Sequence, residues 1–232
     1  MIRIRNRNDR GHADHGWLNA RHTFSFASYN DPQHMHFRSL RVMNEDRVAA
    51  GGGFDTHPHR DMEIVTHVLE GKLEHRDSMG NGEVLTPGEW QWMSAGTGIL
   101  HSEFNPSKDE ATHLYQIWLF PEKKGLTPDY AQKRFDPAGA VNQWQLIAAP
   151  DGRDGALPIR TDAELYNAHL SPGNVLTHTV RPQRGMWLQV LRGTIDLDGA
   201  QLTAGDGAAL TEVEQLTVRG IEQAELLLFD LA

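Results

Sequence analysis

Histidines and carboxylates with the spacing of metal ligands cluster at two places in the sequence. In the first, Pro58 separates His57 from His59, and Glu63 follows four residues later. Side chains alternate along an extended strand, so one strand through this segment would project residues 57, 59 and 63 from the same face. A proline between the histidines removes a backbone donor and suits a strand end, which excludes a helical zinc motif here.

The second cluster contains His101 and Glu103, which again share strand parity. Together the clusters offer three histidines and a choice of two carboxylates, Glu63 or Glu103. Imidazole nitrogens with one carboxylate suit a divalent transition metal such as iron, manganese, cobalt, nickel, copper or zinc, and suit calcium and magnesium poorly. A lone pair of histidines could arise by chance among 13 histidines in 232 residues, but two clusters favour a metal site.

The amino-acid sequence around these clusters resembles that of a known family. Gly51 precedes the first histidine pair by six residues, Gly71 closes the following strand, and the second cluster follows Pro87-Gly88-Glu89. This spacing resembles the two motifs of the cupin superfamily. The wording RHTFSF, HPHRDMEIVTHVLEG and PGEWQWMSAGTGILHSE resembles the pirin family over about residues 21–120, and the resemblance becomes weaker afterwards.

The pirin resemblance implies a site and an activity. It implies one divalent transition metal, with Fe(II) expected first, held by His57, His59, His101 and Glu103. Bacterial pirin-like proteins resemble quercetin 2,3-dioxygenases, so the expected substrates are a flavonol or other small phenol and dioxygen. Glu103 would also be the catalytic residue that accepts the proton of the flavonol 3-hydroxyl. Glu63 would then orient a ligand or fix a turn.

Two other functions stay open at this point. Eukaryotic pirins are described as transcriptional co-regulators, so a metal-dependent regulatory or redox-sensing protein that docks on a partner is the main alternative. A cupin isomerase or oxygenase acting on another small molecule is the third hypothesis, because a pocket lined by aromatic side chains accepts many flat phenols.

The remaining histidines carry no ligand spacing. His67, His75 and His113 lie on expected strands, and we expect each to be a hydrogen-bonded or surface side chain. Phe24 and Phe26 alternate in the RHTFSF segment, so they belong either to the core or to the wall of a pocket for a flat substrate.

Composition narrows the function classes further. The absence of cysteine excludes disulfides, thiolate metal sites and cysteine nucleophiles. A net charge of −9 opposes binding to phosphate backbones, so a nucleic-acid partner is not expected. No stretch approaches the roughly 18 apolar residues of a membrane span, and no signal sequence is recognisable, which makes a cytoplasmic protein the expectation.

Short alternating segments bounded by glycine, proline or Asn81-Gly82 predict an all-β chain. The resemblance implies two tandem cupin β-barrels that face each other, with few short helices. Residues 120–142 are rich in proline, glycine and charge and predict a linker. We therefore expect an N-terminal metal-binding domain at residues 1–135 and a C-terminal domain at residues 136–232.

The second domain repeats motifs of the first without its ligands. Residues 190–193 (VLRG) match residues 68–71 (VLEG), and residues 204–206 (AGD) match residues 87–89 (PGE). Laying the first pair of motifs over each other puts Thr179 and Arg181 in place of His57 and His59. The second pair puts Val218 and Gly220 in place of His101 and Glu103, and His178 has the wrong parity to replace a ligand. We expect a degenerate cupin domain without metal.

Overall fold

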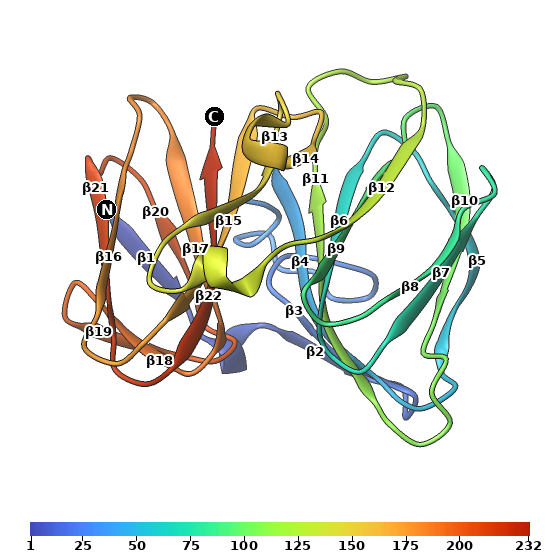
Figure 1. Ribbon diagram of the computed structural model, residues 1–232, viewed down its shortest axis with the longest axis horizontal. Helices are drawn as coiled ribbons and strands as arrows, with labels where there is room; N and C mark the ends of the chain where they lie inside the picture. The colour runs from blue at the N-terminus through green and yellow to red at the C-terminus, as the bar shows by residue number, and fades with distance from the viewer. The chain divides into compact units, whose positions relative to one another are not determined.

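The computed structural model describes residues 1–232 and consists almost entirely of β-strands, which confirms the all-β prediction (Figure 1). Three 3-10 helices are the helical elements: η1 (Arg7–Asp9), η2 (Pro137–Ala140) and η3 (Arg153–Gly155). None of these helices could span a lipid bilayer.

The chain separates into two compact units. The N-terminal barrel comprises Gly11–Phe135 and Ile159–Thr161, and the C-terminal barrel comprises Met1–Arg10, Asp136–Pro158 and Asp162–Ala232. This division differs from the expected spans 1–135 and 136–232 at two short segments. The larger difference arises because the first strand extends the sheet of the C-terminal barrel by pairing with residues 207–210. That the two barrels face each other stays a prediction.

The N-terminal barrel contains two sheets, with orders β12-β9-β6-β11-β4-β3-β2 and β5-β10-β7-β8. Apolar side chains from both sheets, including Val68 and Leu73, form a common buried cluster. The strands are β2 (Gly11–Asp14), β3 (Leu18–His22), β4 (Leu40–Val48), β5 (Gly53–His59), β6 (Glu63–Glu70), β7 (Leu73–Asp77), β8 (Gly82–Leu85), β9 (Glu89–Ser94), β10 (Ile99–Phe104), β11 (Thr112–Leu119) and β12 (Asp129–Arg134).

The C-terminal barrel has the same plan, with orders β1-β20-β17-β22-β15-β13-β14 and β16-β21-β18-β19. Its core is a continuous apolar cluster drawn from both sheets. The strands are β1 (Ile2–Arg5), β13 (Gln145–Ala149), β14 (Leu157–Pro158), β15 (Ala163–Leu170), β16 (Val175–Thr179), β17 (Gly185–Arg192), β18 (Thr194–Leu197), β19 (Ala200–Thr203), β20 (Gly207–Leu210), β21 (Gln215–Gly220) and β22 (Ala224–Leu231).

The structure shows where the expected hairpin turn lies and that the expected linker is partly a strand. Strands β7 and β8 form the expected antiparallel hairpin, but its turn spans residues 78–81, and Gly80 adopts the positive φ of 96°. Part of the expected linker at residues 120–142 is strand β12, which pairs with β9 and extends the sheet of the N-terminal barrel.

Strand β10 pairs with β5 on one side and with β7 on the other, as the right-hand part of Figure 1 shows. His101 lies opposite His57, whereas Glu103 lies opposite Phe54, so the register shifts between these two positions of β10. A β-bulge in β5 thus lets Phe54 and His57 share one face although their parity differs. Bulges of this kind re-aim side chains and are common beside functional sites.

Glu63 does not continue the strand that carries His57 and His59, so the shared parity expected for these residues is wrong. Strand β5 ends at His59, Asp61 turns the chain with a φ of 52°, and β6 begins at Glu63 in the other sheet. Ile64, the next residue, packs into a buried cluster with Ile99 of β10. Since neighbouring strand residues face opposite ways, Glu63 points away from that cluster.

Both oxygens of the Glu63 carboxylate accept hydrogen bonds. It is buried and accepts hydrogen bonds from Trp92 Nε1 (2.7 Å), Ser94 Oγ (2.5 Å) and the backbone N–H of Arg160 (3.0 Å). The Arg160 guanidinium in turn donates to Asp129 Oδ2 at 2.6 Å. Glu63 therefore fastens residues 159–161 to the N-terminal barrel.

Replacing Glu63 should change stability and leave metal content intact. Glu63→Ala removes the acceptor of two buried N–H donors, and an unsatisfied buried donor costs about 1–3 kcal/mol, so we expect a loss of at least about 2 kcal/mol. Glu63→Gln is the matched control, because its carbonyl can still accept while its amide donates to Ser94. Differential scanning calorimetry with elemental analysis checks both variants. A Glu63→Ala protein that keeps its melting temperature but loses its metal would make Glu63 a ligand.

Candidate metal centre

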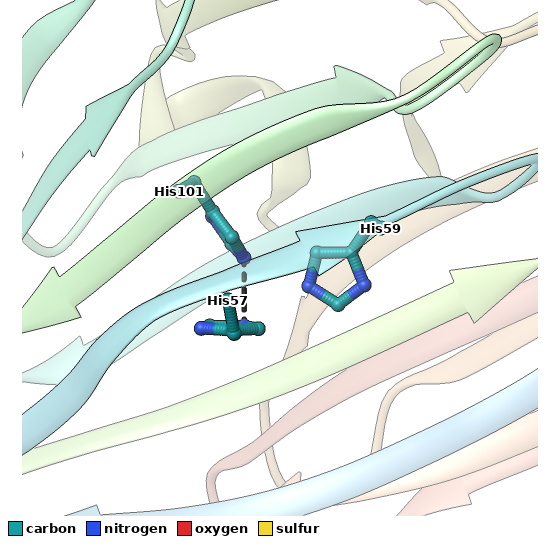
Figure 2. Close-up of side chains that lie close together, drawn as sticks. All are labelled: His57, His59 and His101. Carbon is teal, nitrogen blue, oxygen red and sulfur yellow. Dashed lines mark hydrogen bonds between the residues drawn. The ribbon is translucent and has the colours of Figure 1, made fainter.

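Three histidines from two neighbouring strands meet in the N-terminal barrel. His57 and His59 lie on β5 and His101 lies on β10, and one ring nitrogen of each lies within 4.8 Å of the others. Figure 2 shows the rings converging, with His101 Nε2 3.0 Å from His57 Nε2. The sequence prediction that these three histidines come together is confirmed.

Burial keeps the rings of His59 and His101 uncharged. Burial, together with neighbouring His101 and His57, lowers the pKa of His59 to about 3. Burial likewise lowers the pKa of His101 to about 3, with His57 and His75 contributing. Neutral imidazole is the form that binds a metal, so the lone pairs are available at neutral pH.

A backbone contact fixes which nitrogen of His57 is available. His57 Nδ1 lies 2.7 Å from the carbonyl oxygen of Asp55. A carbonyl only accepts hydrogen bonds, so Nδ1 carries the proton and Nε2 carries the lone pair. This lone pair points toward His101, which is the arrangement that a shared metal requires.

Glu103 supplies a carboxylate on the same face of β10 as His101. Its side chain is buried, and Oε2 accepts a hydrogen bond from Gln116 Nε2 at 2.8 Å. The other oxygen, Oε1, is buried without any hydrogen-bond partner. A buried carboxylate oxygen without a donor is costly unless a cation approaches it, so the donor set fits a divalent metal.

The grouping of Glu103 differs from that of Glu63. Glu103 Oε, His101 and His75 form a second set of ligand atoms within 4.8 Å of one another, and His101 belongs to both sets. Glu63 belongs to neither set, and all of its hydrogen bonds lie on the opposite face of β6.

His75 was not expected at the site. It is fully buried on β7, with Nδ1 3.4 Å from His101 Nδ1 and Nε2 3.2 Å from Asp77 Oδ2. The sequence did contain a signal for it: residues 73, 75 and 77 share strand parity, and Leu73 is an apolar core residue on that face. What the sequence could not show is that β7 pairs with the ligand strand β10.

Aromatic rings adjoin the histidines. The Trp118 ring contacts His59 edge-on with centroids 4.7 Å apart, and the Phe26 ring contacts Trp118 at 5.3 Å. Both rings are half-buried. The second alternative for Phe26, the wall of a pocket for a flat substrate, is compatible with this position, whereas Phe24 is buried.

The corresponding strands of the C-terminal barrel carry other residues. Leu176 of β16 lies opposite Val218 of β21, and His178 lies opposite Leu216. If Val218 corresponds to His101, this register places Leu176 and His178, not Thr179 and Arg181, at the positions of the first histidine pair. His178 therefore has the parity of the second histidine, contrary to expectation, and its Nε2 pairs with Asp230 Oδ2 at 3.1 Å.

Comparison with known proteins agrees with this architecture. A family model described as Pirin matches residues 3–119, and a model described as quercetinase C-terminal cupin domain matches residues 146–231. The chain is 51% identical over 231 residues to a protein from Escherichia coli (strain K12) named quercetin 2,3-dioxygenase, covering 100% of this chain and 99% of that protein.

Solved structures give the same result. The crystal structure of YhhW from Escherichia coli matches with a TM-score of 0.97 at 50% identity and covers 100% of this chain and 98% of that one. A crystal structure described as bacterial pirin YhhW in complex with nickel(II) matches with a TM-score of 0.95 at 49% identity, covering 100% and 99%. Sequence and fold agree over the full length, and the chain therefore belongs to the pirin family of two-barrel cupin proteins.

Proposed function

We propose that this chain is a metal-dependent dioxygenase that opens the ring of flavonols such as quercetin. The observation that carries the proposal is the convergence of three imidazoles beside a carboxylate oxygen that lacks a hydrogen-bond donor. The full-length similarity to a protein named quercetin 2,3-dioxygenase supports the reaction class.

In the proposed site one divalent transition metal is held by His57, His59, His101 and Glu103. We propose Fe(II) as the resident metal, with manganese, cobalt, nickel, copper and zinc as the alternatives that this ligand set also suits. The nickel complex of the related bacterial pirin supports a site of this class. When bound, the metal would polarise the flavonol 3-oxygen and bring dioxygen against the activated ring, which opens with loss of carbon monoxide.

The protein groups have separate tasks in this proposal. The histidines supply lone pairs, and the Asp55 carbonyl keeps the lone pair of His57 on Nε2. Gln116 fixes Glu103 through Oε2, and Trp118 Nε1 donates to Gln116 Oε1 at 3.3 Å, so the carboxylate is held by a relay of side chains. In this proposal Glu103 Oε1, which has no hydrogen-bond partner, is both the metal ligand and the acceptor of the 3-hydroxyl proton.

The aromatic rings beside His59 favour a flat, unsaturated substrate. Trp118 and Phe26 present half-buried rings next to the ligand strand, and aromatic faces and edges pack well against other aromatic rings. A phenolic ring system therefore suits this wall better than a sugar or a phosphate does.

Oxygen uptake tests the proposal directly. Protein loaded in turn with iron, manganese, cobalt, nickel or copper should consume dioxygen with quercetin and release carbon monoxide, beyond the rate of metal and quercetin without protein. No uptake with any of these metals and any flavonol would contradict the dioxygenase and favour the alternative, a metal-dependent regulatory protein that acts by docking on a partner.

Metal content should be one ion per chain. His57→Ala removes one ligand, so elemental analysis should show reduced occupancy, while circular dichroism should show a retained fold because the apolar cores are untouched. Leu176→Ala in the C-terminal barrel is the positional control and should leave occupancy unchanged. Two ions per chain, or unfolding when the metal is removed, would contradict a single open catalytic site.

Glu103→Gln should reduce turnover more than it reduces metal occupancy. The amide keeps the size of the side chain and a weak carbonyl ligand but removes the negative charge and the proton acceptor. Loss of a general base typically costs about 10²–10⁴-fold in rate, so kcat for quercetin should fall in that range. Glu63→Gln is the control and should keep most activity. Metal lost from Glu63→Gln and kept by Glu103→Gln would reverse the assignment of the carboxylates.

A further inference from the structure

One face of strand β11 leads from the proposed metal centre to the surface of the N-terminal barrel. Gln116 and Trp118 share strand parity, and Phe120, which directly follows the strand, continues it. Gln116 is buried and donates a hydrogen bond to Glu103 Oε2. Trp118 is half-buried and contacts His59, whereas Phe120 is 37% exposed. Burial along this face therefore decreases from the ligands outward to solvent.

The loop between β3 and β4, residues 23–39, lies against this face. Phe26 contacts Trp118 with ring centroids 5.3 Å apart. His36, which is exposed, contacts Phe120 with centroids 5.8 Å apart and an interplanar angle of 81°. The loop thus adds an inner ring beside Trp118 and an outer ring beside Phe120. We call the exposed pair, Phe120 and His36, the rim.

Hydrogen bonds hold this loop in place. Phe26 and Tyr29 exchange backbone hydrogen bonds of 3.0 and 2.9 Å. Arg41 Nη1 donates to the carbonyl oxygens of Ser25 (2.7 Å) and Met35 (3.1 Å), so one guanidinium joins the two sides of the loop. The rings that the loop contributes are therefore preformed, which spares a ligand the entropic cost of ordering them.

The spacing along β11 suits the shape of the proposed substrate. Residues two apart on one face of a strand, such as Trp118 and Phe120, lie about 7 Å apart. A flavonol consists of a flat two-ring system that bears the 3-hydroxyl, and of a pendant phenyl ring joined to it by a single bond. When the 3-oxygen lies at the metal centre, the pendant ring extends away from it by about the width of one ring, which is comparable with this step.

We infer that the rim, Phe120 and His36, is an outer aromatic subsite that binds the pendant phenyl ring of the flavonol. The inference rests on the proposed function and adds the part of the substrate that distinguishes a flavonol from a simple hydroxy ketone. Both rim rings are exposed, so a third ring can pack against them edge-on or offset. The continuous row from Glu103 through Trp118 to Phe120 connects this subsite to the metal centre.

Two ligands that differ only in the pendant ring test the inference without turnover. 3-Hydroxyflavone carries this ring, whereas 3-hydroxychromone keeps the metal-binding hydroxy ketone and lacks it. Each is titrated without oxygen into nickel-loaded protein, and Kd is measured by isothermal titration calorimetry. Wild type should bind 3-hydroxyflavone more tightly. Phe120→Ala should raise Kd for 3-hydroxyflavone about 2–10-fold and leave Kd for 3-hydroxychromone unchanged.

Two further variants separate the subsite from a general loss of structure. Phe120→Leu keeps apolar contact area without a ring, so its Kd for 3-hydroxyflavone should lie between those of wild type and Phe120→Ala. Val84→Ala changes another exposed apolar side chain of the same barrel and should alter neither Kd. An equal effect of Phe120→Ala on both ligands, no effect on either, or failure of both ligands to bind would overturn the inference.

The binding measurements and the oxygenase reaction can fail separately. Selective loss of 3-hydroxyflavone binding in Phe120→Ala, together with absent oxygen uptake by wild type, would refute the proposed function and leave the subsite standing. Oxygen uptake with both compounds, together with the same ratio of Kd values in Phe120→Ala and wild type, would overturn the subsite and leave the proposed function.

Discussion

The metal centre of the N-terminal barrel depends on one electrostatic constraint: three imidazoles, of which His101 is buried and His57 and His59 are half-buried, must direct lone pairs at a single place. His101 Nε2 and His57 Nε2 lie 3.0 Å apart, a separation that two charged rings could not tolerate. Burial disfavours the charged form, and each neighbouring ring adds to that effect. The barrel thus supplies a set of imidazole lone pairs that can bind a metal cation.

Several features of the fold serve that constraint. Because of the bulge in β5, His57 lies opposite His101 of β10 and projects from the same face. The Asp55 carbonyl within the bulge accepts the Nδ1 proton of His57. On the other side of β10, strand β7 presents His75 to His101. The carboxylate of Glu103 is held from β11 by Gln116, so both sheets of the barrel contribute to the geometry.

The histidines could be predicted from sequence because their signal is local. A His-Pro-His segment and a His-X-Glu segment each fix a shared face by parity alone. The same rule failed for Glu63 because parity holds only within one strand. Strand β5 ends at His59, and Asp61 turns the chain with a positive φ before β6 begins at Glu63. The contact of His75 with His101 could not be predicted, because it arises from the pairing of β7 with β10, which spacing in one segment does not encode.

The all-β fold could likewise be predicted from the sequence, whereas the barrel to which the first strand belongs could not. Alternation in residues 2–5 indicates a strand but not its partner, and that partner, β20, lies about two hundred residues away in sequence. The repeat between the barrels was also detectable, yet its alignment through VLRG misplaced the ligand counterparts by three residues. The register of β16 with β21 shows apolar Leu176 and Val218 where the N-terminal barrel carries His57 and His101.

Anomalous diffraction from crystals of the nickel-loaded protein would test the central claim most directly, since it locates the metal among the side chains. We predict one peak per chain, about 2.0–2.2 Å from Nε2 of His57, Nε2 of His101, a ring nitrogen of His59 and a carboxylate oxygen of Glu103. A peak bound to Glu63, a peak on Nδ1 of His101, or a peak confined to the C-terminal barrel would contradict it.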